Sequence, residues 1–559
     1  MATITFLKSD LVKESGLRKP EETVPKIGME VENDDGREIT IDITPNRPDL
    51  LDIVGLSRQL ALHEGVRKPR AYSSSGDSGI TVKAGTGVKA VRPYIAALVI
   101  KDVSFTDDSL RYLINFSEKI SETLGRNRRK LAMGIHDLSA IKGDLTYDGA
   151  REGKMVTLLE NKEMDFADII ENTQKGTAYK NTVMGKNKKT IFPFLKDSEK
   201  IISLIPITNS SYTKTTVHTK SLFIDITGTD ANVVSKVADI FACRFIDAGA
   251  KVYSVKVLAP DSTSKHFPEL KSETAKIKTS GLNEIIGYKA TGFDIGKLAA
   301  MSGYILTNAE KNGSATVSIP PYRYDVLNNQ DVYEDLMFAY GYDNVESRAV
   351  PSVNPGKPEN FSEFENAVTE TMIGLGYTEA YNNYLTNEKY EFELMEREHE
   401  PDGVISIKYA KTENISIMRC SILPALMRNL SDSSSEPMPY KIFEIGDVFG
   451  ISNGKVIEGK HMAFVSEHAK ADFAEAKSIV IAILTSIGIK ASFEQKSDAS
   501  FITGRCAAVM VSSRDIGAIG ELHPKVLNNF GIEEPVVGCE IDLAKLESKY
   551  MHDASGQPK

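Results

Sequence analysis

The densest group of acidic side chains lies in the segment PPYRYDVLNNQDVYEDLMFAYG. Apolar residues recur every three or four positions in its second half, which predicts a helix carrying Asp331, Glu334 and Asp335 on one adjacent face. With Asp325 from the preceding loop, these carboxylates predict an all-oxygen site suited to Mg²⁺. The alternative is a helix whose first turn is acidic because the helix dipole favours negative charge there.

A second polar group lies on the predicted strand Leu222–Gly228. Side chains alternate between the two faces of a strand, so Asp225 and Thr227 point the same way. Thr229 or Asp230 can cap the helix that follows. This strand, turn and helix would place a carboxylate, a hydroxyl and free backbone N–H groups near one point.

Other sequence patterns exclude several kinds of chemistry. The chain has no HExxH, GxxxxGK(S/T), GxSxG or dinucleotide fingerprint, so zinc hydrolases, phosphate loops, serine esterases and nicotinamide enzymes are unsupported. Adjacent His136 and Asp137 could form a polar pair in a pocket or a structural pair. The four cysteines are far apart without a CxxC pair, so we expect reduced core residues.

Length and charge restrict the class of protein. At roughly 150 residues per domain, 559 residues predict about four domains. The net charge of −10 argues against a chain coated in nucleic acid but leaves room for local basic patches. Arg126–Lys130 and Lys186–Lys189 are two candidates, although such runs are more often merely solvated loops. No apolar stretch approaches about 18 residues and the N-terminus does not resemble a signal peptide, so we expect a cytoplasmic protein with no membrane contact.

Linker-like segments divide the chain. Tyr72–Thr86 is rich in Ser and Gly, and Ala259–Pro268 and Pro351–Pro358 contain several prolines. Near the N-terminus, Asp49 is the expected N-cap of a helix that ends at Gly65. We predict a multidomain α+β chain of mixed and antiparallel sheets with helices, with domains at residues 1–88, 89–262, 268–347 and 356–559.

Several of these segments resemble one known family in the same order. NRPDL (46–50), MGIHDL (133–138), PITNSSYTK (206–214), FIDITGTD (223–230) and PPYRYDV with DVYEDLMFAYGYDNV resemble the β subunit of phenylalanine–tRNA ligase of the archaeal and eukaryotic kind. MRCSILP (418–424), IFEIG (442–446) and IGELHP (519–524) extend the resemblance to its synthetase-like domain. The resemblance covers nearly the whole chain.

The resemblance implies a division of labour between two subunits. It implies an N-terminal α/β domain, an editing domain, a small magnesium-binding, winged-helix-like module and a class II synthetase-like domain. An α subunit would bind ATP and phenylalanine and join this chain and tRNA(Phe) in an α₂β₂ enzyme. The Arg-x-Glu and Gly-rich ATP-binding motifs of class II synthetases are not recognisable in this sequence, so the last domain would be catalytically silent.

The resemblance also assigns roles to particular residues. Asp325, Asp331, Glu334 and Asp335 would be the magnesium ligands, either structural or shared near α. Asn209, Asp225, Thr227 and Ser203 would belong to the editing pocket, which hydrolyses tRNA(Phe) mischarged with tyrosine.

Physical chemistry explains why such a pocket is needed. An apolar pocket rejects an isostere with one added hydroxyl by only about a hundredfold, so a phenylalanine site admits some tyrosine. A second site that hydrogen-bonds the phenol, through Asp225 or Asn209, can remove the error. We predict a tRNA-assisted attack of water, oriented by backbone N–H groups and these side chains.

Two other functions remain open from the sequence. A stand-alone aminoacyl-tRNA deacylase would need residues 89–262 but no α subunit. A non-catalytic RNA-binding scaffold would use residues 268–347, whose family counterpart resembles a winged nucleic-acid-binding module. Purification with an equimolar partner, hydrolysis by the isolated chain, or RNA binding without either would separate the three.

Overall fold

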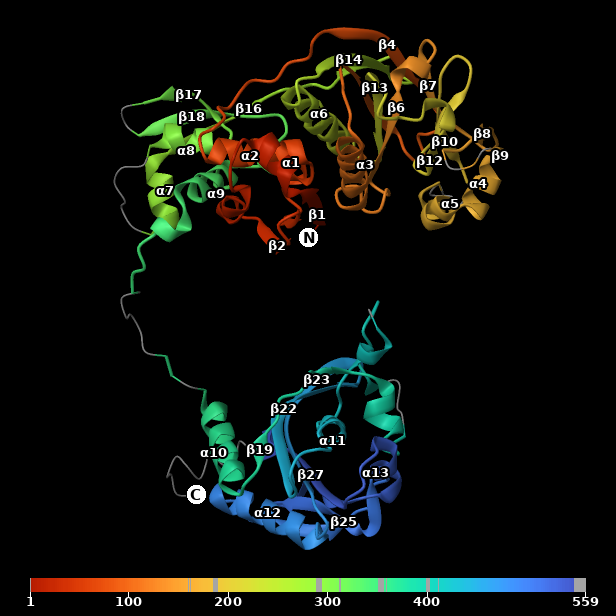
Figure 1. Cartoon of the computed structure of the whole chain (residues 1–559). Coiled ribbons are helices and arrows are strands. Elements are labelled where there is room, and N and C mark those ends of the chain that lie inside the picture. The colour runs from red at the N-terminus through yellow and green to blue at the C-terminus, as the bar shows by residue number, and fades with distance from the viewer. Residues whose placement is uncertain are drawn as a thin grey trace. The chain divides into compact units, whose positions relative to one another are not determined.

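The computed structural model (Figure 1) describes residues 2–546 except 159, 161, 184–189, 288–293, 311–312, 350–355, 358, 399–402 and 411. The chain forms two compact units, residues 1–349 and 350–559. Both combine helices with mixed or antiparallel sheets, so the predicted α+β class is confirmed. The predicted patch Lys186–Lys189 and most of the linker Pro351–Pro358 lie outside the described residues.

The N-terminal part is a small antiparallel sheet with two helices. Its strand order is β1-β3-β2, with β1 at Ala2–Leu7, β3 at Glu38–Ile43 and β2 at Glu30–Asp34. Helix α1 spans Lys8–Ser15 and α2 spans Ile53–His63. The expected N-cap was wrong: Asp52 caps α2, accepting from the Val54 N–H, because Asp49 instead binds Arg47 and Arg58.

A buried ion network joins this part to the rest of the first unit. Arg58 contacts Asp49 and, on another helix, Asp247, each at 2.9 Å. Its guanidinium carbon also lies 3.6 Å from the ring centroid of Tyr322, 264 residues further along the chain (322 − 58). These side chains are buried, so the three N-terminal predicted domains meet at one desolvated contact.

A ten-stranded mixed sheet forms most of the first unit. Its order is β12-β11-β10-β7-β4-β14-β5-β13-β6, with β15 paired to β14. The strands span Thr208–Asn209, Ile201–Leu204, Phe192–Lys196, Leu145–Ala150, Asp77–Ala84, Lys251–Leu258, Tyr94–Lys101, Ser221–Gly228, Leu131–Asp137 and, for β15, Ser264–Phe267. Helices α3 (Asp107–Glu122) and α6 (Ala231–Asp247) meet through stacked Phe116 and Phe241 and pack against β6, β5 and β13.

Two predictions about this region have different outcomes. Asp230 caps α6, accepting from the N–H groups of Asn232 and Val233, so the predicted strand, turn and helix is confirmed. The linker expected at Tyr72–Thr86 was wrong for residues 77–84, because β4 pairs in parallel with β14 and β7. Half-buried Ile80 and buried Val82 lie on the inward face of this strand, which the Ser- and Gly-rich composition of the stretch did not indicate.

Two small groups of elements complete the first unit. The hairpin β8 (Lys154–Val156) and β9 (Glu163–Asp165) packs with α4 (Phe166–Asn172) and α5 (Gln174–Tyr179) around a core of its own. The sheet β16-β18-β17 spans Glu273–Lys278, Ser314–Ile319 and Ile305–Ala309. Its helices are α7 (Thr279–Ile286), α8 (Ile295–Met301) and α9 (Asn329–Tyr340).

The C-terminal unit is built on a seven-stranded sheet with a core on each face. The order is β19-β22-β23-β27-β26-β25-β24, spanning Thr378–Glu379, Tyr440–Ser452, Lys455–Glu467, Val536–Asp542, Arg514–Leu522, Phe501–Val511 and Ser492–Gln495. Helices α10 (Asn360–Gly374) and α12 (Phe473–Ser486) share one core, and α11 (Leu423–Asp432) and α13 (Pro524–Phe530) share the other. A two-stranded pair, β20 (Leu385–Thr386) and β21 (Ile417–Met418), lies outside this sheet.

Two further expectations concern cysteines and membranes. Cys243, Cys506 and Cys539 are buried, as expected for core residues, and Cys420 is half-buried. Among the described residues, no helix is both long enough and apolar enough to cross a lipid bilayer.

The buried network yields a stability prediction. Arg58→Met should lower the free energy of unfolding of the first unit by about 3–5 kcal/mol, because it leaves buried Asp247 without a counter-ion and Asp49 with Arg47 alone. The matched control is Arg111→Met, whose exposed pair with Asp108 contributes about 0–1 kcal/mol. Urea denaturation of both variants measures the difference, and equal losses would show that the network does not join these parts.

Candidate functional site

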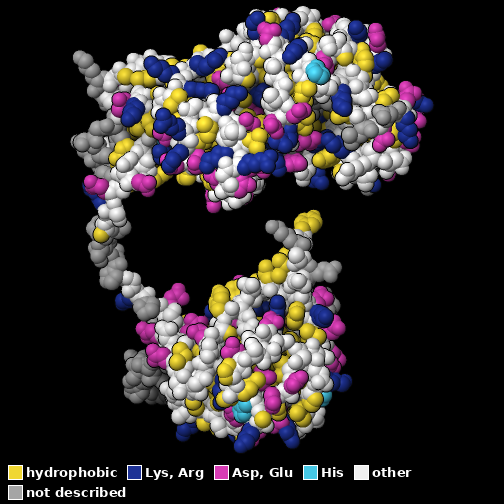
Figure 2. Space-filling model, in the orientation of Figure 1, with side chains coloured by type: hydrophobic (Ala, Val, Ile, Leu, Met, Phe, Trp, Pro, Cys, Tyr) yellow, Lys and Arg dark blue, Asp and Glu magenta, His cyan; other side chains and the backbone are white. Residues whose placement is uncertain are grey.

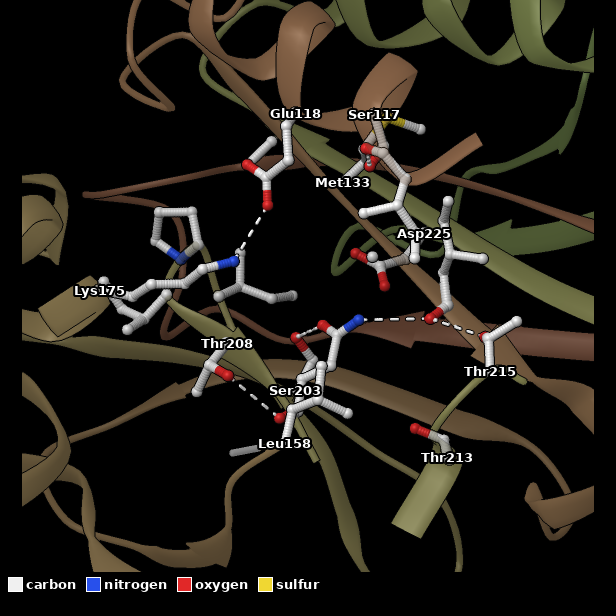
Figure 3. A pocket seen from close by; sticks show the side chains of 18 of the residues that line it. Ser117, Glu118, Met133, Leu158, Lys175, Ser203, Thr208, Thr213, Thr215 and Asp225 are labelled. Atoms are coloured by element: carbon white, nitrogen blue, oxygen red, sulfur yellow. Dashed lines mark hydrogen bonds and ion pairs between the residues drawn. The ribbon is translucent and has the colours of Figure 1, made fainter. Parts of the chain in front are cut away.

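A cavity of about 220 Å³ lies between α3, β6, β13 and the β11–β12 hairpin (Figure 3). Its walls are largely apolar, with side chains from Leu110, Ile114, Met133, Ile135, Leu158, Ile205, Pro206 and Ile207. Polar groups enter from several elements: Ser203, Thr208, Asn209, Thr213, Thr215, Asp225 and Thr227. Apolar walls with a few converging polar groups are typical of a small-molecule binding site.

All four residues predicted for the editing pocket line this cavity, but they have different partners. Ser203 donates to Asn209 Oδ1 at 3.0 Å across the β11–β12 pair, and Asn209 Nδ2 donates to the Ile135 carbonyl at 3.3 Å. Asp225 lies on β13 opposite Gly134 of β6 and is only 1% exposed. Their roles stay predictions, since geometry places them without showing what they bind.

Thr227 has a structural partner that the sequence did not reveal. Arg92 donates from Nε to Thr227 Oγ1 and from Nη2 to the Thr227 carbonyl, both at 2.9 Å. Its Nη1 donates to the Arg128 carbonyl, also at 2.9 Å. Burial lowers the pKa of Arg92 to about 10, so its charge is largely retained near neutral pH. Thr227 therefore contributes to the wall of the cavity while its hydroxyl accepts from Arg92.

Sequence reasoning singled out His136 but expected the wrong partner. Its Nε2 lies 2.9 Å from Asp225 Oδ1, and its Nδ1 lies 2.8 Å from Thr213 Oγ1. The expected partner, Asp137, instead accepts from the Ser139 N–H and the Thr219 hydroxyl. Alternation on β6 could have shown that adjacent His136 and Asp137 point to opposite faces.

Charged groups lie at another side of the cavity. Glu118 of α3 binds Lys175 of α5 at 3.0 Å and also binds Arg128 (Figure 3 draws the Lys175 contact). Burial opposes ionisation of Glu118, but the two cations outweigh it and lower the pKa of the carboxyl. Arg128 is 8% exposed and donates to the carbonyls of Pro206 and Ile207, so one member of the predicted basic patch Arg126–Lys130 is structural.

The predicted magnesium carboxylates lie in the third part of the first unit, where each has a different environment. Asp325 accepts from Arg323 Nε and Nη2 at 2.9 and 2.7 Å, and Asp335 accepts from the same Nη2 at 2.6 Å and from Tyr304. Asp331 accepts from the N–H groups of Leu327 and Asn328, forming a capping box at the start of α9.

These contacts decide how well the donors fit a metal. Arg323 is 3% exposed, and although burial disfavours its charge, Asp335 and Asp325 hold its pKa well above the usual value. Glu334 is exposed. No group of three or more His, Cys, Asp or Glu suited to a metal occurs among the described residues. The donors as arranged do not fit a shared Mg²⁺ site, and magnesium binding stays a prediction that would require Arg323 to release its carboxylates.

Comparisons with known proteins cover almost the whole chain. Residues 80–244, 275–342 and 347–543 match three family models: the B3/4 domain, the tRNA synthetase B5 domain and the phenylalanyl-tRNA synthetase beta chain CLM domain. The cavity residues fall within the first match and the four carboxylates within the second. The shared order of all three matches agrees with the resemblance described above.

Individual relatives agree with these models. The phenylalanine–tRNA ligase beta subunit of Archaeoglobus fulgidus is 34% identical over 93% of this chain and 94% of its own length. The same subunit of Methanocella arvoryzae is 34% identical over 98% and 100%. An N-terminal fragment of the phenylalanyl-tRNA synthetase beta subunit from Pyrococcus horikoshii superposes with a TM-score of 0.57 at 29% identity, covering 61% of this chain and all of that one. The chain therefore belongs to the family of phenylalanine–tRNA ligase β subunits.

Proposed function

We propose that the cavity hydrolyses tRNA(Phe) mischarged with tyrosine, and that an α subunit carries out the ATP-dependent attachment of phenylalanine. The observation that carries the editing proposal is the buried Asp225 carboxylate in a cavity with largely apolar walls. Such a site binds an aromatic ring through its walls and distinguishes tyrosine by its hydroxyl, which can donate to Asp225. Phenylalanine would leave the buried carboxylate unpaired, and this penalty disfavours the correct product.

The reaction requires water rather than an enzyme nucleophile. Among the described residues, no Cys and no Ser paired with a His lines the cavity, and the hydroxyl residue that is paired with a His, Thr213, is only 1% exposed. We therefore assign hydrolysis to a water that attacks the ester carbonyl carbon, while the C–O bond to the tRNA ribose breaks and its oxygen takes a proton. Asp225 would hold the phenolic end of the substrate, Asn209 and Ser203 would help to orient the rest of the tyrosyl group, and the tRNA would supply part of the remaining positioning.

The C-terminal unit supports the proposed partnership with α. Figure 2 shows hydrophobic side chains among charged and polar ones on the face of this unit that it draws. Tyr381, Val456, Ile457 and Ile373 are 83, 61, 52 and 56% exposed. Exposed apolar side chains mark a surface that a partner covers when they form one contiguous patch. We propose that this unit is the catalytically silent class II-like domain and that it docks α within an α₂β₂ enzyme, with ATP and phenylalanine bound mainly by α.

The editing proposal predicts a selective loss of hydrolysis. Asp225→Ala combined with Asn209→Ala should lower kcat/KM for tyrosyl-tRNA(Phe) by roughly 10- to 100-fold, because a hydrogen bond to a charged group contributes about 1.5–3 kcal/mol. Charging with phenylalanine by the αβ complex should be unchanged. Release of labelled tyrosine from pre-charged tRNA measures the first rate, and hydrolysis at the wild-type rate would contradict the proposal.

The partnership predicts activity that depends on α. The chain alone should not charge tRNA(Phe), whereas the complex co-expressed with its α subunit should do so with phenylalanine and ATP. Ile457→Asp, in the exposed end of the β22–β23 hairpin, should weaken co-purification with α, and Val66→Asp, at a similarly exposed position of the first unit, serves as control. A folded chain that never binds α would favour a stand-alone deacylase instead.

A further inference from the structure

Three buried side chains form a continuous hydrogen-bonded row beside the cavity: Thr213, His136 and Asp225. They are 1, 0 and 1% exposed. The row crosses three elements, since Thr213 ends a short 3₁₀ turn at Ser211–Thr213 while the other two lie on β6 and β13. The contacts join residues 77 and 89 positions apart, so each depends on the completed fold.

The strand register explains why the row reaches Asp225. Asp225 is opposite Gly134, and His136 is opposite Phe223, so His136 and Asp225 are diagonal neighbours on one face of the sheet. Gly134 leaves the space between them open. A Cβ at that position would lie 2.4 Å from Asp225 Oδ1, 2.7 Å from His136 Nε2 and 3.1 Å from Asn209 Oδ1. Polar atoms from three strands therefore converge at a backbone without a side chain.

The donor and acceptor roles in the row follow from Asp225. A carboxylate can only accept, so His136 Nε2 carries the proton in this contact. In the neutral imidazole Nδ1 then accepts from the Thr213 hydroxyl, which fixes the ring orientation. The carboxylate torsion of an aspartate is soft, and this contact restrains it by holding Oδ1. Among the described residues Oδ2 has no hydrogen-bond partner, although Asp225 lines the cavity.

We propose that His136 is a positioning residue of the editing site, an inference that rests on the proposed function. It holds Asp225 Oδ1 so that Oδ2 faces the phenolic hydroxyl of a tyrosyl ester, and Thr213 holds His136 in turn. Gly134 provides the opening in which these groups meet. His136 does not contact the reacting ester. Its effect is on recognition of the hydroxyl, and therefore on discrimination between tyrosyl and phenylalanyl esters.

Two substitutions at one position separate this role from packing alone. In His136→Gln the amide nitrogen can reach the place of Nε2 and donate to Asp225, whereas in His136→Asn the shorter amide reaches only the place of Nδ1 and can bind Thr213. Both variants keep a polar side chain of smaller volume than imidazole. Exposed His218, whose backbone N–H binds Thr216, provides the control His218→Gln.

The assay uses the αβ complex with tRNA(Phe) pre-charged with tyrosine or phenylalanine. His136→Asn should lower kcat/KM for tyrosyl-tRNA hydrolysis by roughly 10- to 100-fold and reduce its ratio to that for phenylalanyl-tRNA. His136→Gln should stay within about threefold of wild type, as should His218→Gln. Phenylalanine charging should be the same for all, and the two His136 variants should have similar Tm values, below that of His218→Gln. A His136→Asn that matches His136→Gln in both rate and selectivity would overturn the proposal.

Two further outcomes are informative. If His136→Asn does not fold, Thr213→Val tests the same row, because it removes the hydroxyl that orients the His136 ring while keeping the side-chain volume nearly constant. Thr213→Val should lower the ratio of kcat/KM for tyrosyl-tRNA to that for phenylalanyl-tRNA several-fold. An unchanged ratio would overturn the proposal. Failure of the wild-type complex to hydrolyse tyrosyl-tRNA would overturn the proposed function as well. Normal wild-type hydrolysis with unaffected variants would overturn only the role of His136.

Discussion

Strand β13 lies between two neighbouring strands and beneath α6, where an unpaired polar group is strongly unfavourable. Its residues 222–228 are nevertheless apolar except for the Asp225 carboxylate and the Thr227 hydroxyl. The two side chains have different hydrogen-bond partners. Arg92 donates to Thr227, whereas His136 donates to one oxygen of Asp225. What distinguishes the candidate site is therefore a carboxylate that lines a cavity and has one oxygen without a hydrogen-bond partner among the described residues.

A second set of buried charges keeps that strand in place. Arg58 links the N-terminal helix α2 to Asp247 at the end of α6, and its guanidinium lies over Tyr322. Arg244 of α6 also binds Asp52, the residue that caps α2. Because α6 packs directly on β13, the N-terminal part supports the helix that packs against the strand carrying Asp225. Asp49 of the NRPDL segment also binds Arg58, so this segment has a structural role. Its residues lie outside the cavity lining.

The sequence predicted local features well because their causes are local. The alternation in Leu222–Gly228 placed Asp225 and Thr227 on one face, and spacing predicted the acidic helix that the structure shows at Asn329–Tyr340. It could not predict partners that only the fold brings together. Arg92 meets Thr227 across 135 positions, and Arg323 takes up two of the four expected metal ligands. Asp49 has the residue type of an N-cap, but its carboxylate instead accepts hydrogen bonds from buried Arg47 and Arg58.

Recognition of the hydroxyl of a misattached tyrosine by Asp225 can be tested with a crystal structure of the chain bound to a non-hydrolysable tyrosyl-adenosine ester analogue. We expect the aromatic ring in the cavity beside β13, with its phenolic oxygen about 2.5–3.0 Å from Asp225 Oδ2, while the phenylalanyl analogue leaves the site empty at the same concentration. A tyrosyl analogue bound with its hydroxyl directed away from Asp225, or equal occupancy by both analogues, would contradict it.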